Sequence, residues 1–429
     1  MEEPPVRQLK PLPKGLNQAV ILERLAKAHL RQGKIGEALV IYNDLTQKYP
    51  IELTYFLHVS AILHFLGKKE EARKVLVAGV SGRPYAVKST KEKPEARVFR
   101  LRGMQNGYFN LMKLGKGFKI KMTGGGFSNS YLIDPNRYQT INYIVHGDNL
   151  IADQHLPSFD IIVNSIADTD IEGDSLKAVS DFIGENPDFP LINAPEKVIQ
   201  TSRDNNYRRL NEIEGIIFPR TVRLPAKDYA LKVLETFVSL NGFTLPFLVR
   251  ESGTQTGKSF AMVESLEELQ ERLKKPVRND FYLIEYIEEK YRNEYFRKMR
   301  IFFIDGYLYP VVCHIDQMWN VHGSNRKEFM ASHDWMLEEE RNFLTDPQNY
   351  LGEEIYNRIK GLCDVIDLDF FGVDFTVTEK GEVLIYELNP AMRHSFDHAR
   401  NFPYMTAHMQ DITDAFNDMI QTRLVKKEG

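Results

Sequence analysis

Hydrophobic residues are concentrated near the C-terminus in two runs, FFGVDFTV and EVLIYEL, which flank a short polar segment containing Lys380-Gly381. Aromatic and β-branched residues dominate both runs, so the pattern predicts two strands joined by a tight turn. If the hairpin is centred on Lys380-Gly381, Asp374 lies opposite Glu387, and Asn389 shares the face of Glu387 because side chains alternate. Opposed carboxylates repel each other unless a cation lies between them, and magnesium prefers oxygen ligands. The hairpin is therefore either a magnesium site or a solvated hairpin whose acids face water.

Residues 17–92 have a helical pattern that repeats after 34 positions, because Gly33, Ala38 and Pro50 recur as Gly67, Ala72 and Pro84. Glycine between two helices, alanine where they cross and proline after the second helix resemble tetratricopeptide repeats. The repeats are interpreted either as a docking surface for a protein partner or as plain helical packing. The preceding residues 1–16 are polar and proline-rich, so a flexible tail is expected there.

Strand-like and helical runs alternate across residues 93–198. The runs ARVFRLRG, YQTINYIVHGD and FDIIVNSIAD are typical of buried strands, and SLKAVSDFIGEN is typical of a helix. Strands that alternate with helices indicate a small α/β domain with a parallel sheet. The segment Gly124–Gly126 is either a glycine-rich turn or a loop that offers backbone donors to a ligand.

A glycine-containing loop interrupts the run PFLVRESGTQTGKSF. The loop contains Ser252, Gly253, Gly257, Lys258 and Ser259. It lacks the first glycine of a phosphate-binding P-loop, and the residues after it resemble a strand rather than a helix. We therefore predict a loop between antiparallel strands, which either closes over nucleotide phosphates or is a flexible hairpin tip.

Two further runs add candidate chemistry. DFYLIEYIEEKY predicts a strand ending in Glu285-Tyr286-Ile287, whose main chain could contact an adenine edge. RKMRIFFIDGYLYPVVCHI predicts two strands around the turn Asp305-Gly306, with Arg300 on the first strand. Helices are expected from residue 337 to residue 364.

Composition is ordinary for a water-soluble protein. The chain has 429 residues, of which 43% are hydrophobic, so it is long enough for several domains with real cores. A net charge of −4 gives no reason to expect nucleic acid or membrane binding, and two cysteines indicate neither disulfides nor a zinc site. No stretch reaches the length of a membrane span, so a cytoplasmic location is expected.

The order of these features resembles the ATP-grasp superfamily, in particular the carboxylate–amine ligases related to D-alanine–D-alanine ligase, glutathione synthetase and the ribosomal-protein glutamate ligases. The segment Glu387-Leu388-Asn389-Pro390, with Asp374 thirteen residues before Glu387, carries most of the resemblance. The resemblance implies an ATP-grasp domain at 199–425, preceded by the α/β domain. With the helical repeats in front, a multidomain protein is expected. The ATP-grasp domain has two α+β subdomains, one for the nucleotide at about 199–287 and one for the metal and catalysis at about 288–425.

The resemblance implies that ATP and Mg²⁺ are the cofactors. Asp374, Glu387 and Asn389 are expected to hold magnesium, and Arg300, Arg393 and His394 are the catalytic candidates. The expected nucleotide-binding residues are Arg250, Ser252, Gly253, Gly257, Lys258, Ser259, Glu285, Tyr286 and Ile287. A carboxylate on a small molecule or peptide would be phosphorylated by ATP, and an amine would then displace phosphate. The family also suggests a homodimer.

The sequence departs from the family pattern at three positions. Arg250 stands where a lysine usually contacts phosphate, and Lys298 stands where an acid is frequent. A lysine near the start of the domain is absent, so Arg203, Arg208 or Arg209 are alternatives. A kinase that phosphorylates a small molecule, or a repeat-based binding protein with a vestigial nucleotide site, are the competing functions.

Overall fold

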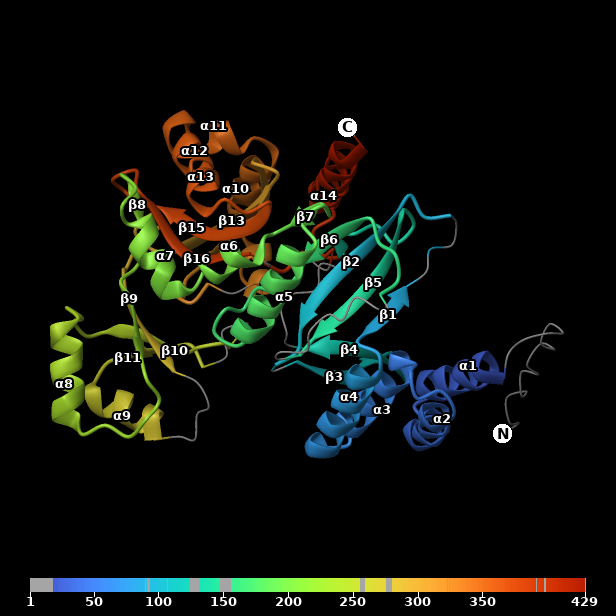
Figure 1. The fold of residues 1–429 in the computed structure, drawn as a ribbon. Helices are drawn as coiled ribbons and strands as arrows, with labels where there is room; N and C mark the ends of the chain where they lie inside the picture. The colour runs from blue at the N-terminus through green and yellow to red at the C-terminus, as the bar shows by residue number, and fades with distance from the viewer. Residues whose placement is uncertain are drawn as a thin grey trace, which may run out of the picture. The chain divides into compact units, whose positions relative to one another are not determined.

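The computed structural model describes residues 18–428 except 89, 91–92, 106, 124–130, 147–155, 255–258, 275–279, 322, 324, 391 and 397–398. Helices and sheets form two compact units, one containing Met1–Ala86 and Asn106–Gly124 and the other Val87–Gln105 and Gly125–Gly429 (Figure 1). The finer boundaries expected at residues 16, 92, 198 and 287 stay predictions. No helix within the described ranges has the length and apolar character needed to cross a membrane.

The smaller unit contains α1 (Gln18–Arg31), α2 (Ile35–Lys48), α3 (Leu53–Phe65), α4 (Lys69–Gly82), β3 (Tyr108–Leu114) and β4 (Gly117–Thr123). Gly33 and Gly67 have φ angles of 78° and 82°, as expected of residues that reverse the chain after α1 and α3. Ala38 and Ala72 are buried where α1 packs on α2 and α3 packs on α4. Helices therefore occupy the positions of the predicted repeats, whereas their tetratricopeptide character and a docking role stay predictions.

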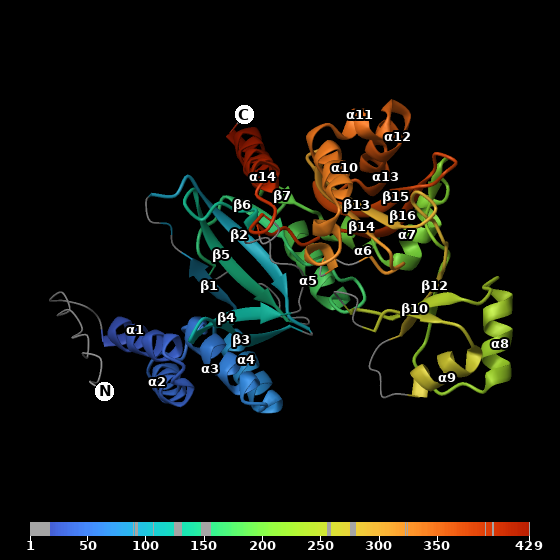
Figure 2. The same ribbon diagram turned by 180° about the vertical axis from the view of Figure 1, so that it is seen from behind.

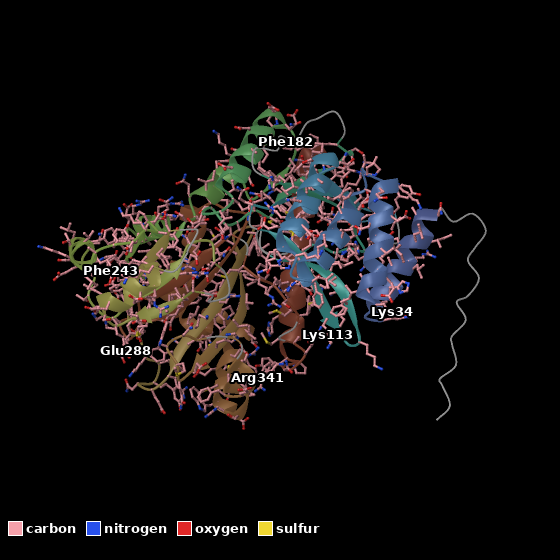
Figure 3. All side chains as sticks on the ribbon, turned by 90° about the horizontal axis from the view of Figure 1, so that it is seen from below. Lys34, Lys113, Phe182, Phe243, Glu288 and Arg341 are labelled. Atoms are coloured by element: carbon pink, nitrogen blue, oxygen red, sulfur yellow. The ribbon has the colours of Figure 1, made fainter. Side chains whose placement is uncertain are left out.

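The larger unit begins with the predicted parallel sheet. Its strand order is β1-β5-β2-β6-β7, with β1 (Tyr85–Lys88), β2 (Ala96–Gly103), β5 (Tyr138–Val145), β6 (Ile161–Asn164) and β7 (Leu191–Ile192). The pairs β2–β5, β2–β6 and β6–β7 are parallel, which confirms the predicted arrangement. The helix α5 (Gly173–Glu185) covers one face, where Phe182 lies 6.1 Å from Phe99 between ring centroids (Figure 3).

The second sheet of this unit is antiparallel and carries the predicted glycine loop. Its strand order is β11-β10-β12-β9, with β9 (Thr221–Leu224), β10 (Phe247–Glu251), β11 (Ala261–Val263) and β12 (Phe281–Glu285). Phe247, Val249 and Leu283 pack against α8 (Leu231–Leu240) and α9 (Leu266–Lys274), with Phe243 in the same core (Figure 3). Because strand side chains alternate, Leu248, Arg250 and Tyr282 point to the opposite face. The loop after β10 joins antiparallel strands, as predicted.

The third sheet has the order β14-β13-β15-β16-β8, with β13 (Phe296–Ile304), β14 (Tyr307–Asp316), β15 (Phe370–Val377), β16 (Val383–Asn389) and β8 (Ile216–Ile217). The helix α10 (Asp334–Thr345) packs against β14, and it clusters with α11 (Pro347–Leu351), α12 (Glu353–Lys360) and α13 (Leu362–Ile366) (Figures 1 and 2). The predicted turn Asp305-Gly306 joins β13 to β14 with φ angles of 49° and 82°.

The β15–β16 hairpin has the predicted pairing at its acidic end, but its turn differs. Asp374 pairs with Glu387, which confirms the predicted register. Nearer the turn the register shifts by one residue at a bulge next to Asp374. A backbone hydrogen bond of 2.9 Å from Thr378 to Glu382 closes the turn, so Lys380 and Gly381 lie in the turn as predicted, but the hairpin is not centred between them. The bulge compensates for the longer turn, and the carboxylates remain opposite each other.

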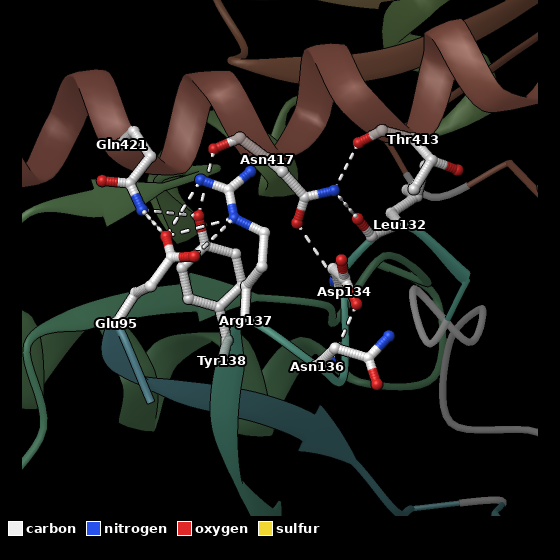
Figure 4. A network of polar contacts seen from close by, with 9 residues as sticks. All are labelled: Glu95, Leu132, Asp134, Asn136, Arg137, Tyr138, Thr413, Asn417 and Gln421. Carbon is white, nitrogen blue, oxygen red and sulfur yellow. Dashed lines mark hydrogen bonds and ion pairs between the residues drawn. The ribbon is translucent and has the colours of Figure 1, made fainter. Parts of the chain in front are cut away.

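The C-terminal helix α14 (Met405–Glu428) fastens the parallel sheet to the third sheet (Figure 4). Asn417 Nδ2 donates to the Leu132 carbonyl at 2.9 Å, and Asn417 Oδ1 accepts from the Asp134 backbone at 3.0 Å. Gln421 Nε2 donates to Tyr138 Oη at 2.8 Å. The same helix packs on β13 and β14, so one element fixes the position of two sheets within the larger unit.

Candidate functional site

One pocket of the larger unit collects segments from all three of its sheets. It lies after β6, at the N-terminus of α7 (Arg203–Leu210), at the end of β10 and at the end of β16. The lining residues are Ala167, Asp168, Thr169, Asp170, Thr201, Ser202, Arg203, Arg250, Ser252, Gly253, Thr254, Tyr282, Glu387, Leu388, Asn389 and Pro390. Six candidate residues named from the sequence therefore lie around one pocket: Arg203, Arg250, Ser252, Gly253, Glu387 and Asn389.

Glu387 is kept ionised by the cations around it. Arg203 Nη2 donates to Glu387 Oε1 at 2.8 Å. Burial opposes ionisation of Glu387, but Arg203, Arg250, Arg300 and Lys298 outweigh burial and lower the pKa of Glu387 to about 2. The carboxylate is therefore negative throughout the physiological pH range, and its position is set by Arg203.

Arg250 is a nearly buried cation on the wall of the pocket. Only 9% of its surface is exposed, and its Nη2 donates to the Thr254 carbonyl. Burial and the neighbouring Arg203 lower the pKa of Arg250 to about 10, so the guanidinium stays charged at neutral pH. The N-terminus of α7 lies on the same pocket and contributes the positive end of a helix dipole. Together these groups suit an anionic ligand such as a phosphate.

Asp374 lies next to this pocket in the sheet, and its carboxylate forms an ion pair with an arginine. Arg300 Nε and Nη2 donate to its two carboxylate oxygens at 2.6 and 2.8 Å. Lys298 Nζ lies 3.9 Å from Asp374 Oδ2, and burial lowers the pKa of Lys298 although Asp374 opposes that shift. Asp374 itself is 3% exposed and does not line the pocket.

The two carboxylates among the three predicted magnesium ligands are each paired with an arginine in the structure. Arg300 donates hydrogen bonds to both carboxylate oxygens of Asp374, and Arg203 donates to one oxygen of Glu387. The two carboxylates are surrounded by more cations than anions. The described residues also contain no group of three or more His, Cys, Asp or Glu side chains that could hold a metal ion. The donor types suit magnesium, and the assignment of Asp374, Glu387 and Asn389 as its ligands stays a prediction.

The base of the glycine loop is well defined. Ser259 Oγ accepts from the Glu251 backbone at 3.1 Å and lies 2.9 Å from Thr254 Oγ1. Gly253 has a φ angle of 69°, and a Cβ atom there would clash with Ile171 Cδ1. The loop therefore needs glycine at its base for both conformation and space. The predicted phosphate-binding residues Gly257 and Lys258 lie outside the described residues.

A polar network beside the pocket is absent from the sequence prediction. Tyr282 Oη donates to Asp170 Oδ1 at 2.8 Å, and Arg223 Nη2 donates to the same oxygen at 2.7 Å. Arg223 also contacts Asp204 at 3.3 Å. The sequence contains one signal for this network, since Asp168 and Asp170 follow the end of a buried parallel strand, where ligand sites of α/β sheets usually lie.

The predicted adenine-binding segment Glu285-Tyr286-Ile287 does not line the pocket. The Glu285 backbone N–H donates to the Arg220 carbonyl at 2.8 Å, so this donor is already used. Tyr286 packs with Trp319 at 5.9 Å between ring centroids, beside an apolar surface on the same face of the sheet as Arg250. That surface, formed by Leu248 and Ile284 with these two rings, offers an apolar contact for a ligand.

The two catalytic candidates after β16 occupy different environments. Arg393 is exposed. His394 is 2% exposed, its Nε2 lies 3.2 Å from Thr413 Oγ1, and its ring packs edge-on against Phe302 and Phe396. Burial lowers the pKa of His394 to about 4, so the imidazole is neutral at pH 7. Neither residue lines the pocket.

Neither a protein-family model nor a curated protein sequence matches the chain. Among solved structures, it is similar to D-alanine–D-alanine ligase from Bacillus anthracis complexed with ATP, with 13% identity, a TM-score of 0.44 and coverage of 78% of this chain and 98% of that one. A RimK domain ATP-grasp protein from Sphaerobacter thermophilus has 12% identity, a TM-score of 0.41 and coverage of 76% and 100%. N5-carboxyaminoimidazole ribonucleotide synthetase from Thermotoga maritima has 12% identity, a TM-score of 0.38 and coverage of 75% of each chain. All three similarities are distant.

Proposed function

We propose that the chain is an ATP-dependent carboxylate–amine ligase with an ATP-grasp domain at 199–425, divided near residue 287 into nucleotide and catalytic subdomains. The observation that carries the proposal is the pocket where Arg203 and Arg250 meet the base of the glycine loop and the Glu387 end of the hairpin. An acidic hairpin on one sheet and a glycine loop on another are the combination that the superfamily resemblance implies.

In this proposal the phosphates of ATP lie against Arg250, the N-terminus of α7 and the glycine loop. Guanidinium groups bind phosphate oxygens through paired hydrogen bonds, and a helix N-terminus adds backbone donors. The adenine ring lies on the apolar surface beside Tyr286 and Trp319, which packs well against a flat aromatic ring. Roles for Ser252, Gly257, Lys258, Ser259, Glu285 and Ile287 in holding the nucleotide are part of the same proposal.

The proposed reaction has two steps. An oxygen of the substrate carboxylate attacks the γ-phosphorus, the bond to the bridging oxygen of ADP breaks, and an acyl phosphate forms. An amine nitrogen then attacks the acyl carbon, inorganic phosphate leaves, and the amine loses a proton. Positive side chains in the pocket stabilise the charge that develops on the phosphoryl oxygens. Arg300 supports them by holding Asp374, and Arg393 is assigned to the substrate or the acyl phosphate.

Protein cations carry much of the charge neutralisation in this site. Lys298 stands where the family often has an acid, and Arg203 and Arg250 border the pocket directly. The role of Asp374, Glu387 and Asn389 as magnesium ligands stays a prediction, because the described arrangement pairs the two carboxylates with arginines. His394 is buried and neutral, so we assign it to positioning the segment after β16 rather than to accepting the amine proton.

The decisive experiment mixes the purified chain with Mg-ATP and pooled amino acids and short peptides, each pool tested with and without an amine acceptor. A ligase releases ADP and phosphate only when an acid and an amine are both present. A stable phosphorylated product that forms without an amine would instead identify a kinase. Absence of ADP formation with every pool, together with no nucleotide binding, would contradict both enzymatic functions.

A pair of matched variants links the activity to the pocket. Arg250→Met removes the buried pocket cation and should lower ADP formation by roughly a hundredfold, as expected for loss of a group that stabilises transition-state charge. Arg272→Met is the control, since Arg272 belongs to the same region, and its ion pair among the described residues is with Glu268 on the surface of α9, at 2.9 Å. Equal activity of the two variants would contradict the assignment of the pocket.

Assembly and cellular context follow from the proposal only as expectations. We infer that the helices of the smaller unit bind a protein partner or a protein-borne substrate, because the spacing of their glycines and alanines resembles that of repeat proteins. A homodimer and a cytoplasmic location are the expectations for a ligase of this kind. Size-exclusion chromatography with light scattering tests the dimer directly.

A further inference from the structure

Two arginines lie nearly buried on the parallel sheet without a carboxylate to balance them. Arg100 is 6% exposed and Arg102 is half-buried, and both belong to β2. The buried Nε atom of each has no hydrogen-bond partner among the residues that the structure describes. No carboxylate of the described residues forms an ion pair with either guanidinium. An unpaired buried charge is costly for a fold, so these arginines require an explanation.

Further polar groups without partners lie on the same face. Arg100 and Arg102 are two residues apart on a strand, and Asn142 of β5 is the register partner of Arg100. Ser165 continues the pairing of β6, because its backbone N–H donates to the Leu101 carbonyl at 3.0 Å. Asn142 Oδ1 and Ser165 Oγ are buried and also lack partners. Four neighbouring side chains therefore have unused hydrogen-bonding capacity.

The position of this cluster is one where ligands commonly bind. The opposite face of the sheet is covered by α5 through Phe99 and Phe182, so the arginines are not part of that core. Arg102 is one residue from the end of β2, and Ser165 directly follows β6. Ligands of parallel α/β sheets bind at the carboxyl ends of the strands. None of the four residues lines the pocket proposed for ATP.

We propose that Arg100, Arg102, Asn142 and Ser165 form a second binding site, for a small oxyanion such as a carboxylate or a phosphate group. Two guanidinium groups supply positive charge and paired donors that match the oxygens of such a group, and the hydroxyl and amide groups supply further donors. Burial alone lowers the pKa of Arg102 to about 10, and burial together with Arg102 lowers the pKa of Arg100. A bound anion removes this electrostatic penalty, so ligand binding and stability are coupled.

The site goes beyond the proposed ligase activity and does not depend on it. The test follows the thermal unfolding of the full chain with increasing phosphate or succinate, against sodium chloride at matched ionic strength. Isothermal titration calorimetry gives the affinities. In the wild type both oxyanions should raise the melting temperature, and chloride should not. In Arg250→Met, which removes phosphate binding at the proposed ATP pocket, a larger response to phosphate assigns a phosphoryl ligand, and a larger response to succinate assigns a carboxylate ligand. No response to either anion would overturn the proposal.

Substitutions separate this site from the ATP pocket. Arg100→Met should weaken anion binding by about tenfold or more and should raise the melting temperature in chloride alone, since it removes a buried unpaired charge. Arg97→Met is the matched control on the same strand, because Arg97 is 41% exposed and lies 3.6 Å from Asp160. Arg250→Met removes phosphate binding at the ATP pocket but should keep the rise in melting temperature that comes from anion binding at Arg100. The double variant Arg100→Met with Arg250→Met should lose the remaining response.

A milder variant keeps the test informative if Arg100→Met does not fold. Ser165→Ala removes one hydroxyl and should weaken anion binding by roughly threefold to tenfold, with little change in stability. Equal anion responses in Ser165→Ala, Arg100→Met and Arg97→Met would overturn the site. Failure of the ligase assay would leave these measurements unchanged, so the two proposals fail separately.

Discussion

At Glu387, burial and charge act in opposite directions. Burial would favour the neutral acid, yet four cations keep the carboxylate ionised, with a pKa of about 2. The same cations would repel one another without this carboxylate and Asp374 between them. Each acid of the hairpin therefore positions an arginine, Arg203 for Glu387 and Arg300 for Asp374. In this arrangement the acids hold in place the guanidinium groups that our proposal assigns to the neighbourhood of the phosphates.

Glu387→Gln tests this role directly. The substitution keeps the shape of the side chain but removes the charge that holds Arg203 at 2.8 Å, so ADP formation should fall by roughly a hundredfold while the fold is retained. Glu379→Gln, at the exposed turn of the same hairpin, should behave like the wild type. Circular dichroism verifies the fold of both variants. Near-normal turnover in Glu387→Gln would show that Glu387 has no role in the chemistry.

We expect the larger unit to lose stability in acid because of the buried, neutral His394. Its pKa is lowered to about 4 in the folded protein, against about 6.5 in an unfolded chain, so the unfolded state binds more protons between these values. Stability should therefore fall as the pH decreases from about 6.5 to 4, by at most about 3 kcal/mol from this residue. His394→Gln does not titrate in this range and should show a smaller loss in urea unfolding at pH 5 than the wild type. An identical pH dependence would rule out this contribution.

At the scale of elements, local patterns in the sequence predict strands and their register better than they predict connections. The pairing of Asp374 with Glu387 follows from alternation, which the whole strand supports. The centre of the turn differs from the prediction because a bulge and a longer turn compensate for each other, and only three-dimensional packing decides between the two solutions. The hairpin β3–β4 is missing from the predicted elements, although GFKIKMT alternates and Gly115 has a φ angle of 59°.

The candidate site was predictable where one segment contains the chemistry. The glycine loop and the acidic hairpin are contiguous motifs, so their residues could be named in advance. Asp170 and Arg223 could not, because they are 53 positions apart and meet only through the fold. Arg100 and Asn142 are also hidden in strands that read as ordinary core. Contacts between distant strands leave no local pattern in the sequence, so a single sequence does not predict them.

Gly253→Ala tests the base of the glycine loop as an element. The added methyl group would clash with Ile171, and the alanine backbone would be strained at a φ angle of 69°. The loop should therefore shift, and ATP affinity should fall about tenfold or more. Adding Ile171→Ala relieves the clash but not the backbone strain, so the double variant should recover only part of the affinity. Nucleotide titration by calorimetry measures both effects. Full wild-type affinity in Gly253→Ala would show that the loop base does not position the nucleotide.

At the scale of the whole molecule, α14 holds together two of the three sheets that contribute to the pocket. The helix reaches the parallel sheet through Asn417 and Gln421, and it reaches the β13–β14 end of the third sheet through Arg423, which contacts Asp305 at 2.6 Å. Its apolar residues Met409, Ile412 and Phe416 are buried, so packing and polar contacts act together. The helix is therefore a structural support for the pocket without contributing a residue to it.

Asn417→Ala tests this support at a distance from the pocket. The variant leaves the Leu132 carbonyl and the Asp134 N–H without their partner, which should cost about 1–3 kcal/mol of unfolding free energy. Gln410→Ala is the control on the same helix, because Gln410 is exposed and contacts only Asp414 at 2.9 Å among the described residues. Hydrogen exchange should quicken in β5 and in α14 of Asn417→Ala, and ATP affinity should fall with it if the helix maintains the site. Unchanged exchange and unchanged stability would mean that packing alone holds the two sheets together.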